Sequence, residues 1–106
     1  MKIKFKNGVT KECDAPKEQK IYKNSGEKIE DAGWLVNLRI NGIMTSNEVD
    51  ELLIPENISS MKFFDYGDNE KNEFILNGYE KVTSSVINYS ENISEAYAEI
   101  QLSKGV

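Results

Sequence analysis

Polar and apolar residues alternate at the start of the chain, where residues 2–6 read Lys-Ile-Lys-Phe-Lys. Strict alternation over a short stretch predicts a half-buried β-strand. The Asn7-Gly8 pair that follows readily adopts the positive φ angles of a type I′ hairpin turn, and residues 9–13 alternate again. The pattern predicts a β-hairpin with its apolar side chains on one face and its lysines in water.

The strictest alternation spans residues 34–41, in which every second residue is large and apolar. This predicts a strand with one face in the core. A helix is expected next, because Thr45-Ser46-Asn47-Glu48 forms a capping box and apolar residues then recur at helical spacing. Pro55 should end that helix, which places it at about residues 46–54.

The remainder of the chain reads as short strands separated by turn residues, among them the hairpin-forming pair Asn77-Gly78. The predicted strands are residues 58–66, 72–76, 81–89 and 95–102. The predicted fold is therefore α+β, with about six or seven short strands in a mainly antiparallel sheet and one short helix.

Residues 14–33 do not follow this pattern, because they are polar and are interrupted by Pro16, Ser25-Gly26 and Ala32-Gly33. We expect a loop there, either ordered or mobile, with at most a short strand near residues 19–23. Long loops in small domains are often binding loops, so this stretch is a candidate contact surface.

A chain of 106 residues is long enough for one hydrophobic core but short for two, so a single domain over residues 1–106 is expected. The apolar content of 39% is sufficient for such a core. The residues expected in it are Trp34, Val36, Leu38, Ile40, Val49, Leu52, Leu53, Phe74, Leu76, Val82, Val86, Ile100 and Leu102.

The residue types present argue against an enzyme. There is no histidine, which excludes Ser-His-Asp and Cys-His catalytic sites, and the one cysteine, Cys13, cannot form a zinc site alone. The glycines are isolated and form no phosphate-binding loop. We therefore expect no catalytic residue, no cofactor and no metal. No stretch approaches the roughly 20 apolar residues of a membrane span, and no signal peptide is recognisable, so a cytoplasmic location is expected.

The net charge of −5 is unevenly distributed. Residues 1–47 hold nine basic and six acidic side chains, a balance of +3, whereas residues 48–106 hold four basic and twelve acidic ones, a balance of −8. An acidic half argues against binding to a nucleic-acid backbone. It favours a protein partner with a basic surface.

Tyrosines and carboxylates occur together in the acidic half, as they do both in protein-binding faces and in ordinary pairs on a solvated sheet. The stretch 65–70 also gathers oxygen donors around a glycine, but its spacing differs from a calcium loop and is typical of a hairpin tip. The candidate partner-binding residues are Asp65, Tyr66, Asp68, Glu70, Glu73, Tyr97 and Glu99.

In its length, in its content of Lys, Asn, Ile and Glu, and in its Thr45–Leu53 helix between strands, the chain resembles small acidic proteins of prophages in low-GC Gram-positive bacteria. The resemblance implies an inhibitor of a host defence protein, such as an anti-CRISPR protein that blocks a nuclease through an acidic surface. The alternative is a tail or baseplate component that self-associates through sheet edges. The resemblance assigns no functional residue.

Overall fold

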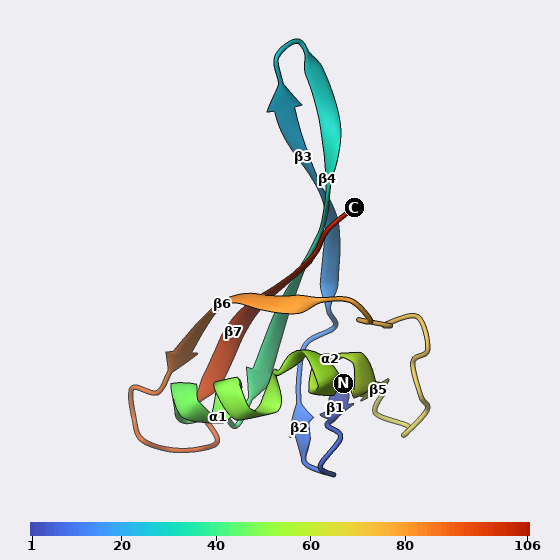
Figure 1. Cartoon of the computed structure of the whole chain (residues 1–106). Coiled ribbons are helices and arrows are strands. Elements are labelled where there is room, and N and C mark those ends of the chain that lie inside the picture. Colours follow the sequence, from blue (N-terminus) through green and yellow to red (C-terminus); the bar gives the residue numbers. More distant parts are fainter.

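The computed structural model describes residues 1–106 and folds them into two antiparallel sheets and two short helices (Figure 1). The fold is α+β and rich in strands, as the sequence predicts. The elements are, in chain order, β1 (Lys2–Lys4), β2 (Thr10–Glu12), β3 (Lys17–Ser25), β4 (Lys28–Asn41), α1 (Ser46–Leu52), α2 (Pro55–Ser60), β5 (Lys62–Phe64), β6 (Glu80–Ile87) and β7 (Tyr97–Lys104).

The smaller sheet has the strand order β2-β1-β5, and the larger sheet has the order β3-β4-β7-β6. All neighbouring strands are antiparallel. The long strand β4 connects two regions of the molecule, because β3 pairs with it from Lys28 onward whereas β7 pairs with it only from Trp34 onward. The first part of β4 therefore extends beyond the rest of the sheet.

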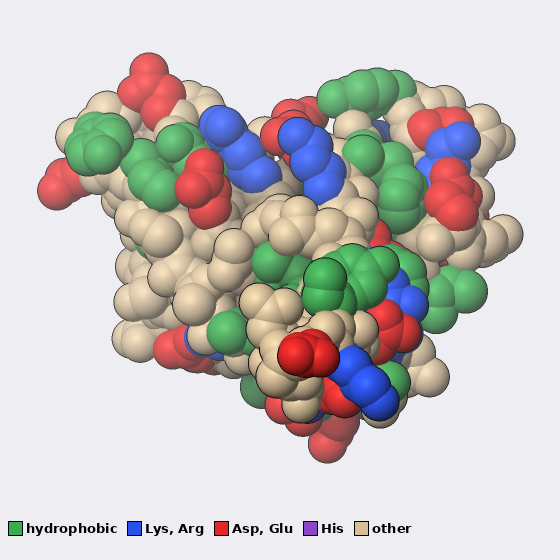
Figure 2. All heavy atoms as spheres, turned by 90° about the horizontal axis from the view of Figure 1, so that it is seen from above, with side chains coloured by type: hydrophobic (Ala, Val, Ile, Leu, Met, Phe, Trp, Pro, Cys, Tyr) green, Lys and Arg blue, Asp and Glu red, His purple; other side chains and the backbone are tan.

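The expectation of a loop over residues 14–33 is wrong. These residues form β3 and the first part of β4, which pair as a hairpin around Gly26. The part of this hairpin beyond the β7 pairing, residues 21–32, projects from the molecule and is called the arm below (Figure 1). Viewed along the arm, charged side chains of both signs and apolar side chains are interspersed (Figure 2). Because the arm buries neither face against a core, its sequence has no period of two.

The hairpin of β1 and β2 is confirmed, but its turn is not of type I′. The Phe5 N–H donates to the Val9 carbonyl at 2.9 Å, and of the three residues between them only Gly8 has a positive φ, of 88°. This three-residue turn places Lys11 opposite Ile3 on the buried face. The expectation that every lysine of the hairpin faces water is therefore wrong for Lys11.

The predicted helix start is confirmed, since the Glu48 N–H donates to the Thr45 hydroxyl at 3.2 Å. Helix α1 ends at Leu52, and Pro55 then begins a second helix, α2, because proline is well suited to the first helical position. The predicted strand over residues 58–66 is thus reduced to β5. Neither helix is long or apolar enough to cross a lipid bilayer.

The predicted strand over residues 72–76 is also absent. This segment is irregular, and it directs Phe74 and Leu76 inward without pairing to any strand, so the Asn77-Gly78 pair closes no hairpin. Two buried side chains that are two residues apart produce the same sequence pattern as a half-buried strand, whatever the backbone conformation. The last two predicted strands correspond to β6 and β7.

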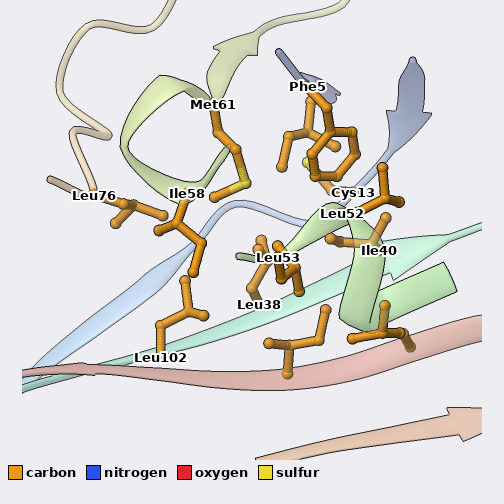
Figure 3. Close-up of a cluster of buried hydrophobic side chains, with 14 of the residues drawn as sticks. Phe5, Cys13, Leu38, Ile40, Leu52, Leu53, Ile58, Met61, Leu76 and Leu102 are labelled. Carbon is orange, nitrogen blue, oxygen red and sulfur yellow. The ribbon is translucent and has the colours of Figure 1, made fainter. Parts of the chain in front are cut away.

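The core lies between one face of the larger sheet and a cover made of both helices and the smaller sheet (Figure 1). Figure 3 shows Leu38, Ile40 and Leu102 of the larger sheet opposite Leu53, which follows α1, and Ile58 of α2. Each such side chain contributes about 1.5–3 kcal/mol when fully buried. The cluster comprises Ile3, Phe5, Cys13, Val36, Leu38, Ile40, Ile43, Val49, Leu52, Leu53, Ile58, Met61, Phe63, Leu76, Tyr79, Ala98, Ile100 and Leu102.

Most of the predicted core residues are in this cluster or against it. Trp34, Phe74 and Val86 are partly buried and pack on its surface. The prediction is wrong for Val82, which is 55% exposed because the strand is irregular between residues 81 and 83 and leaves it outside the pairing with β7.

Candidate functional site: the open face of the larger sheet

One face of the larger sheet is covered by the core and the other is open to solvent. Alternate residues of β4, such as Val36 and Leu38, point into the core, so their neighbours Asn37 and Arg39 point to the opposite side. The same alternation holds in β7, where Ala98, Ile100 and Leu102 are buried. No helix covers this second face, which we call the open face (Figure 1).

A row of polar side chains crosses the middle of the open face. The Gln101 amide donates to the Asn37 side-chain oxygen at 3.1 Å, and the Thr83 hydroxyl donates to the Gln101 side-chain oxygen at 3.2 Å. Lys17 of β3 is opposite Asn37 in the register and extends the row to the far edge. These side chains come from all four strands, so strand pairing fixes their positions.

Next to this row, Arg39 stacks on Tyr97. The guanidinium carbon lies 3.7 Å from the centre of the Tyr97 ring, within the range of a cation–π interaction. Glu99 is opposite Arg39 in the β4–β7 register. Two of the predicted partner-binding residues, Tyr97 and Glu99, are therefore neighbours on the open face, and both are beside an arginine that the sequence interpretation did not select.

Two shallow depressions lie on the open face, one on each side of Asn37 and Glu99. The first has a volume of about 260 Å³ and the second about 270 Å³, and both are bordered mainly by polar side chains. Such surfaces can donate and accept hydrogen bonds. The first is lined by Asp14, Ala15, Lys17, Asn37, Leu38, Arg39, Glu99 and Ile100, and the second by Asn37, Thr83, Ser84, Ser85, Glu99 and Gln101.

Asp65 serves to hold a turn together. Its carboxylate accepts the Gly67 N–H at 2.9 Å and the Asn69 N–H at 3.0 Å. The hydrogen bond from the Asn69 backbone, and then that from Gly67, lower the pKa of Asp65. The carboxylate thus closes the tip after β5, as expected for an Asx turn. No group of three or more His, Cys, Asp or Glu side chains is arranged to hold a metal ion.

The other predicted residues of this segment have separate surroundings. The Asp68 carboxylate forms an ion pair with the Lys2 ammonium group at 3.1 Å. The backbone of Glu70 forms an isolated antiparallel β-bridge with that of Phe64, and Tyr66 is 78% exposed. Glu73 is exposed on the irregular connection to β6. This segment lies beside the smaller sheet, whereas β7 begins on the other side of the molecule (Figure 1). The seven predicted residues therefore form two surfaces and not one.

Sequence interpretation missed Asn37, Arg39, Thr83 and Gln101 as members of the open face. The available signal was the polar half of the alternating strand at residues 34–41, since side chains between buried positions must share the opposite face. Only the apolar half of that pattern was used to predict structure. The partners of Asn37 and Arg39 on β7 depend on the strand register, which the local sequence does not specify.

Two titratable side chains of the core, Cys13 and Tyr79, have raised pKa values. Burial raises the pKa of the Cys13 thiol to about 11, which leaves little thiolate at neutral pH. Burial, followed by the nearby charge of Glu18, raises the pKa of Tyr79 to about 12. The Lys104 ammonium nitrogen lies 5.0 Å from the centre of the Tyr79 ring.

Most carboxylates of the acidic half form no ion pair. Of the twelve in residues 48–106, Glu48, Asp50, Asp65 and Asp68 form ion pairs, which leaves eight unpaired. Among these eight, Glu99 lies on the open face, Glu80 begins β6, and the others are spread over the helices and connections. The negative charge of this half is therefore spread over several elements and is not concentrated in one patch.

Arg39, Tyr97, Glu99 and the hydrogen-bonded polar row thus form a surface of stacking and hydrogen-bonding groups that a partner can contact. Comparison of the chain with protein-family models, with curated proteins and with solved structures found no match.

Proposed function

We propose that this chain is a non-enzymatic protein-binding module that docks its partner on the open face of the larger sheet. The observation that carries the proposal is the stack of Arg39 on Tyr97 beside Glu99, on a face that no other element covers. Arginine and tyrosine are enriched in the residues that dominate interface energies. Strand pairing holds both side chains in place before binding, which reduces the entropy lost on association.

The charge of the chain favours a partner with a basic surface. A net charge of −5 and eight carboxylates in residues 48–106 that form no ion pair give the molecule a net negative field. Such a field accelerates encounter with a basic partner and weakens as ionic strength rises. The Arg39 guanidinium would then meet an acidic or carbonyl group within an otherwise basic surface, which adds specificity to the charge attraction.

The narrower form of this proposal is an inhibitor of a bacterial defence protein, such as a CRISPR nuclease. Proteins of that kind hold nucleic acid in basic channels, and an acidic module of 106 residues that occupies such a channel would exclude the nucleic acid. The support for this form is the charge distribution together with the resemblance to small prophage proteins.

Pull-down from a bacterial lysate at low and at high salt, with partners identified by mass spectrometry, tests the proposal. We expect one basic protein that is retained at low salt and lost at high salt. Tyr97→Ala should weaken binding at least tenfold, as a loss of more than about 1.4 kcal/mol at a central contact implies. Tyr22→Ala, which removes an exposed tyrosine of the arm, is the matched control and should bind as the wild type does.

Equal binding by the Tyr97→Ala and wild-type chains would show that the open face is not the docking surface. Capture that does not depend on salt would contradict the part of the proposal that concerns partner charge. Circular dichroism of both variants establishes that the fold is retained.

A second candidate, a virion or assembly component, is favoured by the uncovered edges of the larger sheet, β3 and β6. In that case the pull-down would recover phage structural proteins or only further copies of this chain, at both salt concentrations.

A further inference from the structure

The sheets of this protein have several edges, and most of them are protected against pairing with another strand. In the smaller sheet the edge strands β2 and β5 are three residues long. In the larger sheet, β3 carries Lys17, Lys20 and Lys23 along its edge. Short length and lysines are the usual means by which soluble proteins prevent edge-to-edge pairing.

After the irregularity at Val82, the edge formed by β6 carries no lysine and is longer than β2 or β5. Residues 82–90 contain no charged side chain, in a chain in which 29% of residues are charged. No backbone hydrogen bond outside the strand pairing with β7 involves residues 80–87, so the outer edge of β6 has no partner within the chain. The irregularity at Val82 leaves residues 83–87 as the regular stretch that can accept a further strand.

We propose that a second copy of this chain pairs with the β6 edge, β6 against β6 in antiparallel orientation. Residues 83–87 overlap completely only when Ser85 lies opposite Ser85 of the second copy, on the two-fold axis. Thr83 then meets Ile87 of the second copy. The pairing joins four strands from each copy into one sheet of eight, and the two open faces become one continuous surface.

The side chains of β6 match themselves in this register. The small Ser85 meets its equivalent without a steric clash, and β-branched residues meet at Thr83 and Ile87, which favours cross-strand packing. No charged residue of one β6 faces a charged residue of the other over residues 83–87.

The general repulsion between two acidic copies does not prevent this contact. Glu99 is opposite Ser85 in the register, so the two Glu99 side chains of the dimer are three strand spacings apart. That separation is about 14 Å, which exceeds the Debye length of about 8–10 Å at moderate salt. The uncharged edge is thus a place where two copies can meet closely while their carboxylates remain distant.

Light scattering coupled to size-exclusion chromatography of the full chain tests the proposal. We expect a dimer of about 24 kDa, twice the chain mass of 12.0 kDa. Ser85→Lys places two ammonium groups opposite each other, with Cβ atoms about 5 Å apart, and should yield a monomer. Ser85→Glu should do the same, and an equal mixture of the two variants should restore the dimer. Gln19→Lys, at the exposed β3 edge, is the matched control and should remain dimeric.

A wild-type chain that is monomeric at its highest soluble concentration would overturn the proposal, as would a Ser85→Lys chain that stays dimeric. A mixture of Ser85→Lys and Ser85→Glu that remains monomeric, when circular dichroism shows both variants to be folded, would also overturn it. Capture of an unrelated extended peptide by a monomeric chain would assign the edge to a foreign strand instead. Failure of this proposal is distinguishable from failure of the proposed function, because Tyr97→Ala changes a residue of β7 that takes no part in the β6–β6 pairing.

Discussion

Gly33 is the position at which the end of β7 approaches β4 most closely. Gly33 has a φ of 111°, and a Cβ atom there would lie 2.0 Å from the Lys104 carbonyl oxygen. Real Cβ atoms do not approach a backbone oxygen this closely, so a side chain would force one strand to move. Gly33→Ala should therefore detach the end of β7 from β4, starting with the Trp34–Lys104 pair.

The magnitude follows from a comparison with a glycine in open space. Gly26 also has a positive φ, of 68°, but no atom lies within 4 Å of its added Cβ, so Gly26→Ala measures the backbone strain alone. That strain is about 1–2 kcal/mol. Gly33→Ala adds the displacement of a backbone carbonyl and the loss of a strand pair, so we expect about 3–4 kcal/mol in total. A domain of this size has about 5–15 kcal/mol of stability and should remain folded.

Urea denaturation followed by the fluorescence of Trp34, the only tryptophan, measures both variants. Deletion of Lys104–Val106 in the wild-type and Gly33→Ala chains completes a double-mutant cycle. Without the Lys104 carbonyl, the loss of stability caused by Gly33→Ala should fall toward that caused by Gly26→Ala. Equal costs for Gly33→Ala and Gly26→Ala in the full chain would refute the close approach of β7 to Gly33.

Three further changes test other parts of the fold by urea denaturation. Burial raises the pKa of the Cys13 thiol from 9.0 to about 11, so the folded state holds this proton more tightly than the unfolded state does. The resulting stabilisation is complete below pH 9 and is lost as pH rises toward 11. Cys13→Ala should therefore reduce the loss of stability at alkaline pH. Thr45→Ala removes the N-cap of α1 and should cost about 1 kcal/mol, whereas Thr45→Ser should retain it; equal stability of both would argue against the cap. The Lys11 ammonium nitrogen lies 2.8 Å from the Gly42 carbonyl oxygen and 3.1 Å from the Glu48 carboxylate. Lys11→Met removes both contacts and should lower the free energy of unfolding by about 1–3 kcal/mol. An unchanged midpoint of urea denaturation would contradict these contacts.

The parts of the fold that follow from local sequence are those in which neighbours along the chain supply the evidence. Thr45 and Glu48 cap α1 through one local hydrogen bond, and the alternation at residues 34–41 corresponds to β4 with one face in the core. The same period of two placed Tyr97 and Glu99 on one face of β7. In each case the pattern is visible because one side of the element is buried.

The sequence misled where burial did not leave a periodic pattern. The arm buries neither face, so its few apolar residues follow no period of two, and only pairing between β3 and β4 makes it a hairpin. Phe74 and Leu76 alternate like strand residues but enter the core from an irregular segment. A buried side chain must point into the core, but a strand and an irregular segment can both direct it there.

The sequence by itself determined the class of the fold, the start of its first helix, and the face of β7 that carries Tyr97 and Glu99. Tertiary structure decided that Arg39 stacks on Tyr97, that Lys11 lies on a buried face, and that the seven predicted site residues divide into two surfaces. These features depend on the register and order of strands that are distant in the chain. Such pairing is fixed by the collective burial of the core, because a shift of one residue would turn every apolar side chain of a strand to water.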